Sequence, residues 1–113
     1  MRYALLVAVE ERDDLSADDA ARQYAEFMAF QEEIEARGVL VARERLRPSS
    51  SATTVRVRDE GLVVADGPFA ETKEQIAGLY IIECADLDEA IEIASRNPGA
   101  RDGTIEVRPV WEI

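Results

Sequence analysis

The sequence predicts a mixed α+β domain in which helices cover one face of a β-sheet. Three observations indicate this: apolar runs of strand length recur along the chain, two amphipathic segments begin with helix-capping residues, and one stretch alternates as a hairpin does. In order, the elements read strand, helix, strand, hairpin, strand, helix, strand. That order matches a ferredoxin-like sheet with two helices on one face and an added β-hairpin.

The size of the chain suits a single folding unit. It has 113 residues, of which 47% are hydrophobic and 33% are charged. This length supports one hydrophobic core, and the composition lies well away from that of disordered chains. We therefore expect one domain over residues 1–113.

The charge of the chain excludes several kinds of partner. Thirteen basic residues against 24 acidic ones give a net charge of −11, which opposes attraction to nucleic-acid phosphates and to anionic lipid. The first apolar segment has seven residues, too few to span a bilayer, and no processing site follows it. A single cysteine excludes an intramolecular disulfide. We expect a cytoplasmic protein that binds neither nucleic acid nor membrane.

The first two elements have clear signals. Tyr3–Val9 is an unbroken apolar run, typical of a strand covered on both faces. Ser16 precedes Asp19 by the spacing of a capping box, so a helix begins near Ala17. Apolar residues at helical spacing continue this helix until Gly38 ends it.

A charged strand and a hairpin follow. Val39–Leu46 is expected to be a strand with Arg43 and Arg45 on the same face. Thr53–Arg58 alternates between apolar and polar residues, and a short acidic turn leads into Leu62–Ala65. These two segments are expected to form the hairpin.

The last part of the chain completes the sheet. Ile76–Cys84 carries apolar residues on both faces and is expected to be a central strand. Asp86 and Glu89 form a second capping box, which begins a shorter helix that ends before Asn97. Thr104–Val110 is expected to be the final strand.

One face of this sheet lacks a cover. Two helices can cover only one face, but Tyr3–Val9 and Ile76–Cys84 carry apolar residues on both. A second copy of the chain is the economical cover for the other face. We therefore expect a homodimer packed sheet to sheet.

Side chains that could take part in binding or catalysis are most concentrated in one stretch, Asp66-Gly67-Pro68-Phe69-Ala70-Glu71-Thr72-Lys73-Glu74. Its first three residues are typical of a turn, and Phe69 is expected to be a buried plug that holds the loop to the core. The polar residues that follow are either a solvated loop or the rim of a ligand site. In a catalytic site, Asp66 or Glu71 would be the general base and Lys73 would hold a substrate anion.

A cluster of arginines is the second candidate site. Five of the thirteen basic residues fall within sixteen positions of an otherwise acidic chain: Arg43, Arg45, Arg47, Arg56 and Arg58. Arginine suits bidentate contact with a carboxylate or phosphate, so this cluster could bind a small anionic ligand, with Arg43, Arg45 and Arg56 as candidates. The alternative is a solvated strand face that pairs with carboxylates across strands.

Tyr80 is the aromatic residue best placed to line a pocket, because Gly78 on the same strand face leaves room beside it. Tyr24 and Trp111 are expected in the core. Cys84 is expected to be a small buried hydrophobe, since the chain has no histidine that could act as its base. With no histidine and one cysteine, we expect no cofactor, and no metal site beyond weak binding of magnesium by carboxylates.

The nine-residue motif and the order of elements resemble the DGPF branch of the YCII-related family. The similarity extends over essentially the full chain, through the opening MRYALLV, Thr53-Thr54-Val55-Arg56, Asp86-Leu87-Asp88-Glu89-Ala90 and Val107-Arg108-Pro109-Val110-Trp111. The resemblance implies a dimeric α+β barrel of bacterial origin, often encoded beside sigma factors of the extracytoplasmic-function type. The activity of that family is largely unassigned.

Two departures from the family pattern bear on chemistry. Relatives in the wider family pair a histidine with an aspartate as active residues, and this chain has no histidine. Family members also tend to carry His-Pro near the end of the second helix, where this chain has Asn97-Pro98. They tend to carry an aromatic residue before the following glycine, where this chain has Asp102-Gly103. Chemistry that depends on imidazole is therefore not expected.

Three functional hypotheses follow. The first is a small-ligand-binding or regulatory dimer, linked to a sigma-factor partner, with the motif loop and the arginine strand flanking a cleft. The alternative is a cofactor-independent enzyme of the lyase, isomerase or oxygenase type, with Asp66 or Glu71 as base and Tyr80 or an arginine as the polarising group. A third is an interaction protein whose acidic helices dock on a basic partner.

Overall fold

The computed structural model describes residues 1–112, and its centre is a four-stranded antiparallel sheet in the order β2-β5-β1-β6. The two long apolar strands occupy the middle of this sheet, and the charged strands lie at its edges. The strands are β1 (Arg2–Glu10), β2 (Leu40–Arg45), β5 (Glu74–Glu83) and β6 (Thr104–Pro109). The prediction of a mixed α+β fold of the ferredoxin-like kind is confirmed.

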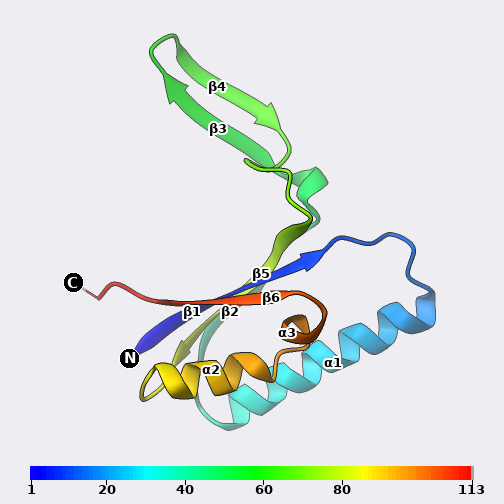
Figure 1. Cartoon of the computed structure of the whole chain (residues 1–113), viewed down its shortest axis with the longest axis vertical. Helices are drawn as coiled ribbons and strands as arrows, with labels where there is room; N and C mark the ends of the chain where they lie inside the picture. Colours follow the sequence, from blue (N-terminus) through cyan, green and yellow to red (C-terminus); the bar gives the residue numbers. More distant parts are fainter. Residues whose placement is uncertain (113) are drawn as a thin grey trace.

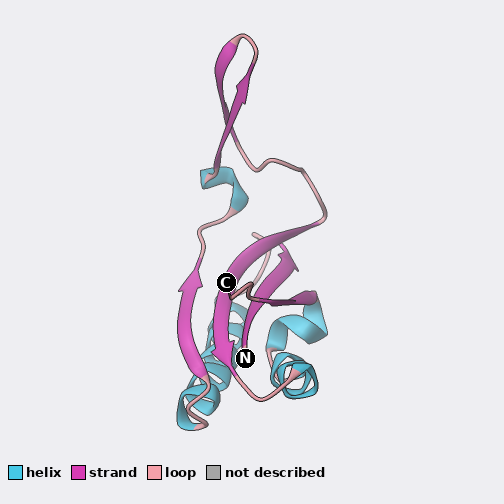
Figure 2. Ribbon diagram, turned by 90° about the vertical axis from the view of Figure 1, so that its left-hand side faces the viewer, coloured by secondary structure: helices cyan, strands magenta, loops and turns pink. Residues whose placement is uncertain are grey.

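All helices lie on one face of the sheet (Figures 1 and 2). The two long helices are those predicted, α1 (Ala17–Ala36) and α2 (Leu87–Ser95), and a 3₁₀ turn, η1 (Ser49–Ser51), follows β2. A third, short helix, α3 (Pro98–Asp102), begins where the sequence indicated only a stop. Proline fits its first turn because that position needs no N–H donor. No helix among residues 1–112 is long and apolar enough to cross a membrane.

Both long helices begin at the predicted caps. Ser16 Oγ accepts a hydrogen bond from Asp19 N at 3.0 Å, and Asp86 Oδ1 accepts one from Glu89 N at 2.9 Å. Glu89 also reaches back and accepts a hydrogen bond from Ala85 N at 2.9 Å. These bonds satisfy donors that a helix start leaves unpaired.

The hydrophobic core lies between the helices and the sheet. On β1, Tyr3, Leu5 and Val7 point toward the helices and are almost fully buried. Ile82 from β5 and residues from α1 and α2 complete this layer. The fully buried aliphatic side chains are Leu5, Ile34, Ile82 and Ile93.

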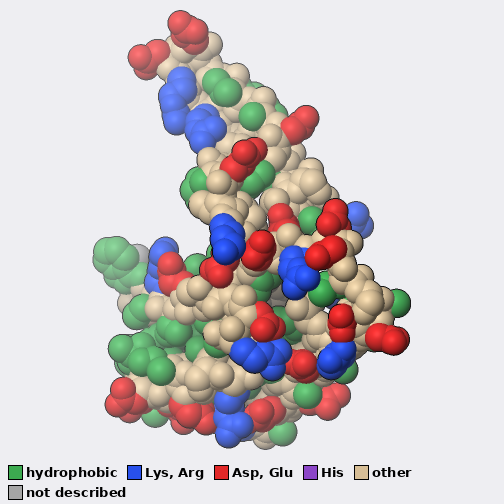
Figure 3. Space-filling view, turned by 45° about the vertical axis from the view of Figure 1, so that its right-hand side comes forward, with side chains coloured by type: hydrophobic (Ala, Val, Ile, Leu, Met, Phe, Trp, Pro, Cys, Tyr) green, Lys and Arg blue, Asp and Glu red, His purple; other side chains and the backbone are tan. Residues whose placement is uncertain are grey.

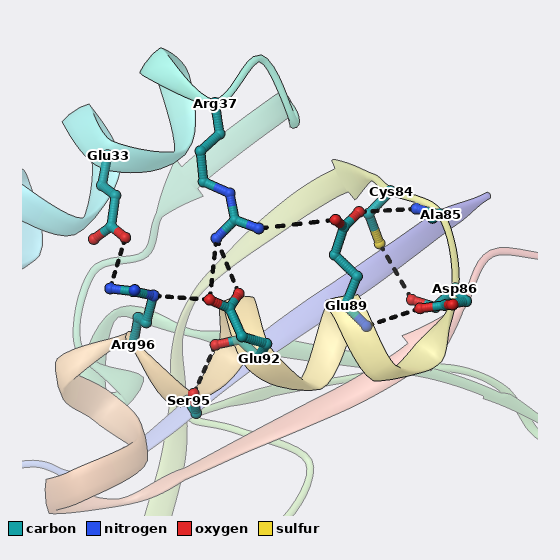
Figure 4. A network of polar contacts seen from close by, with 9 residues as sticks. All are labelled: Glu33, Arg37, Cys84, Ala85, Asp86, Glu89, Glu92, Ser95 and Arg96. Atoms are coloured by element: carbon teal, nitrogen blue, oxygen red, sulfur yellow. Dashed lines mark hydrogen bonds and ion pairs between the residues drawn. The ribbon is translucent and has the colours of Figure 1, made fainter.

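Ion pairs connect the end of α1 to α2 on the outside of this core (Figure 4). Glu92 lies at the centre, with Arg37 Nη1 at 2.9 Å and Arg96 Nε at 3.0 Å. Arg96 also contacts Glu33 at 2.8 Å. The hydrogen bonds from Arg37 and Arg96 lower the pKa of Glu92. Because these groups are partly exposed, the network adjusts helix packing and contributes little free energy of its own.

The second face of the sheet has no helix over it. The register sets Leu6 opposite Leu79 and Ala4 opposite Ile81, and these side chains point away from the helices. We call these four residues the open face. Within residues 1–112 no helix or strand packs on it (Figure 1), which agrees with the predicted lack of a cover.

The predicted hairpin forms a separate two-stranded sheet. Its strands, β3 (Thr53–Arg58) and β4 (Gly61–Asp66), pair only with each other. Figures 1 and 2 show this hairpin standing away from the body of the molecule. We refer to β3, β4 and their turn as the arm.

A pair of isoleucines in α2 tests the position of the core. Ile93 is fully buried and Ile91 is 50% exposed, two residues away on the same helix. Ile93→Ala should lower the free energy of unfolding by about 3 kcal/mol, because it leaves a cavity. Ile91→Ala should cost less than about 1 kcal/mol. Urea unfolding followed by circular dichroism measures both, and equal losses would contradict the assigned core.

Candidate functional site

The motif begins as the joint between the arm and the body. Gly67 has a φ of +101°, a conformation that favours glycine, and its N–H donates to Ala52 O at 2.7 Å. Thr54 Oγ1 donates to Gly67 O at 2.7 Å. Asp66 is the last residue of β4, opposite Thr53, and is exposed. The first part of the motif therefore fixes the base of the arm.

The second part of the motif borders a shallow cleft of about 460 Å³, which we call the motif cleft. Gln75 Nε2 shapes its wall by donating to Ala70 O at 3.0 Å and to Thr72 O at 3.1 Å. Glu71 and Lys73 line the cleft, but Asp66 does not. The remaining lining residues are Glu10, Glu11, Ser49, Ser50, Gly67 and Pro68.

Glu11 is a cleft residue that sequence reasoning missed. Its carboxylate accepts hydrogen bonds from Ser49 N, at 2.6 Å, and from Ser49 Oγ. These bonds lower the pKa of Glu11. In the sequence Glu11 belongs to a run of charged residues after the first strand, and only the tertiary contact with η1 distinguishes it from a solvated loop. With Glu10 and Glu71 it makes the motif cleft acidic apart from Lys73.

The prediction that Phe69 is a buried plug is wrong. Its side chain is 82% exposed. The backbone bonds at Gly67 and the Gln75 amide hold this loop, so no aromatic anchor is needed. Trp111 and Tyr24 are also outside the core, at 88% and 54% exposed.

A second group of candidate residues lies on the helix side of the sheet. Arg43 on β2 is opposite Tyr80 on β5, and Arg45 is opposite Gly78, so both arginines are on one face, as predicted. Arg45 Cζ lies 5.8 Å from the centre of the Tyr24 ring. Phe30 of α1 meets Tyr80 edge to face, with ring centroids 5.3 Å apart.

Gly78 does not leave the room beside Tyr80 that the sequence suggested. A Cβ atom at Gly78 would come within 2.9 Å of Glu44 O. The backbone of β2 already occupies that space.

Asn97, at the start of α3, completes this group. Its side chain is 2% exposed, and its Oδ1 accepts a hydrogen bond from Gly99 N at 2.8 Å. Its Nδ2 has no partner at strict hydrogen-bond geometry within residues 1–112, but the Asn97 amide interacts with the Tyr80 hydroxyl and opposes the effect of burial on the pKa of that phenol. Buried polar groups are almost always paired, and Tyr80 is the acceptor beside this amide. We call Tyr80, Arg43, Arg45 and Asn97 the Tyr80 cluster.

Asn97 also borders an open hollow of about 420 Å³ between α1 and the α2–α3 segment. Two ion pairs link its walls: Arg96 with Glu33 at 2.8 Å, and Arg101 with Glu26 at 2.6 Å. The sequence showed this residue only as a departure from His-Pro. The burial of Asn97 and its interaction with Tyr80 are visible only in the folded structure.

Burial raises the pKa of Tyr80, and the Asn97 amide and the charges of Arg43 and Arg45 oppose that rise. The phenol is therefore neutral near pH 7 and can donate a hydrogen bond. Burial likewise raises the pKa of Cys84, which is 7% exposed. Cys84 is a buried thiol, as predicted, and lacks the lowered pKa of a reactive cysteine.

The basic residues form two groups, those with a carboxylate partner and those without one. Most arginines outside the predicted cluster lie within 4.0 Å of a carboxylate. In the part of the chain that the structure describes, the basic residues without such a partner are Arg43, Arg45, Arg47, Arg56, Arg58 and Lys73.

The candidate residues therefore fall into separate places. Glu71 and Lys73 line the motif cleft, and Asp66 lies at the base of the arm. Arg43, Arg45 and Tyr80 share the helix side of the sheet, and Arg56 lies on the arm. No group of three or more carboxylate or thiol side chains within residues 1–112 converges where it could hold a metal ion.

Comparison with known proteins agrees with this fold. The YCII-related domain matches residues 1–113. An uncharacterised protein of Rhizobium meliloti (strain 1021) is 39% identical over 114 residues, which covers 97% of this chain and 92% of that protein. The chain therefore belongs to the YCII-related family.

A solved structure shares the fold at low sequence identity. It is 5-chloro-2-hydroxyhydroquinone dehydrochlorinase from Burkholderia phenoliruptrix AC1100, in complex with 2,5-dihydroxybenzoquinone. The TM-score is 0.52 at 16% identity, over 99% of this chain and 94% of that one. The two chains share a fold, and the solved structure contains a bound small molecule.

The raised pKa of Tyr80 predicts a specific loss of stability in alkali. The unfolded chain releases the phenolic proton near its ordinary pKa of 10.0, before the folded chain does, so stability falls as pH rises above that value. Tyr80→Phe should reduce this loss at pH values above 10.0, as measured by urea unfolding. Tyr24→Phe, at an exposed ring, is the control, and equal pH slopes for wild type and Tyr80→Phe would contradict the burial of the phenol.

Proposed function

We propose that this protein is a dimeric module of the YCII-related family that binds a small anionic organic ligand at the Tyr80 cluster. One observation carries the proposal. Arg43 and Arg45 have no carboxylate partner within residues 1–112, and they lie beside the partly buried Tyr80 phenol, whose hydroxyl interacts with the buried Asn97 amide. All four groups can donate hydrogen bonds to an oxygen-rich ligand.

The charge balance supports an anionic ligand. In a chain of net charge −11, carboxylates are abundant, yet these two arginines remain unpaired. An arginine fork suits a carboxylate or phenolate, and the Phe30 and Tyr80 rings provide apolar contact for a planar molecule. The neighbouring structure in complex with 2,5-dihydroxybenzoquinone provides a ligand of this general class.

The proposed dimer forms sheet to sheet through the open face. Leu6, Leu79 and Ile81 are only half-buried in the single chain, and a second copy would remove them from water. From the resemblance of the motif to the DGPF branch, we further propose a regulatory role beside a sigma factor of the extracytoplasmic-function type.

Ligand binding can be tested by thermal stability. A ligand that binds only the folded chain raises its melting temperature. With 2,5-dihydroxybenzoquinone and simple aromatic carboxylates as probes, we expect at least one to raise the melting temperature of wild type. Arg43→Gln should abolish that rise, and the control Arg47→Gln, beyond the end of β2, should keep it. No shift with any probe, or equal loss in both variants, would contradict the site.

A second candidate function is a cofactor-independent lyase that uses the motif cleft. The observation that favours it is the dehydrochlorinase activity in the name of the structural neighbour. Elimination needs a base that removes a proton, and Glu71 in the cleft or Asp66 at the base of the arm could supply a carboxylate. Lys73 would hold the substrate anion.

Two isosteric variants test the lyase hypothesis. With chlorinated hydroquinones as substrates, Glu71→Gln or Asp66→Asn should reduce turnover at least about a hundredfold, the usual contribution of a general base. Both side chains are exposed, so the melting temperature should stay nearly unchanged. A large loss of stability in Asp66→Asn would mark Asp66 as a structural turn residue, and full turnover in both variants would exclude them as the base.

A further inference from the structure

The arm lacks the packing that a hairpin needs. Its two strands pair with each other and with no other strand, and an isolated two-stranded hairpin is marginally stable in water. Figures 1 and 2 show it extending beyond the body, where no helix covers it. Another surface must therefore stabilise it.

One face of the arm is apolar. The register sets Val55 opposite Val64 and Val57 opposite Leu62. Because side chains alternate along a strand, these four lie on the same face. They are 58 to 71% exposed. Figure 3 shows hydrophobic and basic side chains side by side along the arm, with acidic ones at its tip.

The size of this patch limits what can cover it. Phe69, at the base of the arm, is 82% exposed. Together with the four aliphatic side chains it presents roughly 400 Å² of apolar surface, in the range of the largest patches on monomers. A stable interface buries about 800 Å² on each partner. The arm supplies about half of that, so its partner should also engage a second apolar surface.

The open face is that second surface. The arm rises on the side of the sheet opposite to the helices and stands clear of the open face of its own chain (Figure 1), so it does not cover that face. In a pair of copies related by a twofold axis, each copy provides one arm and one open face. Both apolar surfaces of each copy are then covered by the other copy. A foreign partner would have to match both surfaces independently.

Charge favours the same partner. Arg56 and Arg58 on β3 have no carboxylate within 4.0 Å among residues 1–112. A second copy of this chain carries a net charge of −11, so its excess carboxylates can pair with them. These arginines lie on the face of β3 opposite to Val55 and Val57, so charge attracts a second copy to the arm and the apolar face makes the contact.

We propose that the arm grips a second copy of this chain through Val55, Val57, Leu62 and Val64, with Phe69 at the edge of the contact. The inference rests on the homodimer proposed above and adds the arm to its interface. In such a dimer, the arm of each copy packs against the other copy.

Paired variants on opposite faces of the arm test this inference. Val55→Thr with Val57→Thr makes the apolar face polar, and Val63→Thr with Ala65→Thr changes the other face of the same hairpin. Threonine keeps the strand propensity in both. Sedimentation equilibrium should show a dimer for wild type and for the Val63/Ala65 variant, and a dissociation constant at least about tenfold higher for the Val55/Val57 variant.

Hydrogen exchange gives an independent measurement. Amides of residues 53–66 should exchange slowly in the wild-type dimer and faster on dilution below its dissociation constant. Equal dimer affinity in the two variants, or arm amides that exchange rapidly in a stable dimer, would overturn the role of the arm and leave the sheet-to-sheet dimer standing. A wild-type chain that stays monomeric at all concentrations would overturn both, and the ligand-binding proposal would be unaffected.

Discussion

The structure depends on one constraint: a sheet with two apolar faces and helices for only one of them. β1 sends Tyr3, Leu5 and Val7 toward the helices and Ala4 and Leu6 the other way. Burial of the first set forms the core and orders the sheet. The second set remains half-buried at the surface, so the same alternation that builds the core also leaves an apolar face that a partner could cover. The arm adds a second exposed apolar face.

Electrostatics divides the molecule into a structural part and a part available for binding. Around the helices, arginines form ion pairs with carboxylates, as in the Arg37, Glu92 and Arg96 network (Figure 4). The arginines of β2 form no ion pair with residues 1–112, although acidic residues outnumber basic ones in the chain. Arg43 and Arg45 are exposed and solvated, so they remain available to an anion beside the partly buried Tyr80. The proposed site lies at these arginines of β2, which have no carboxylate partner within residues 1–112.

The sequence predicted the elements well because their signals are local. Ser16 and Asp86 set helix starts, and strict alternation over Thr53–Arg58 set the hairpin. It failed where the outcome depends on tertiary neighbours. Phe69 was expected inside because aromatic residues usually are, but the loop is held by backbone bonds at Gly67.

The candidate site followed the same division. The shared face of Arg43 and Arg45 could be read from the period of a strand. The burial of Asn97 beside Tyr80 and the contact of Glu11 with Ser49 could not, because each depends on two segments that meet only in the folded chain.

Gly67 belongs both to the base of the arm and to the wall of the motif cleft. One residue thus couples two regions that otherwise share little. A partner that held the arm in one orientation would also hold Gly67 in the wall of the cleft, and a molecule in the cleft would in turn act on the base of the arm. Any such coupling would be reciprocal by thermodynamic linkage, so occupancy of the cleft and assembly of the chain would be treated as a single equilibrium.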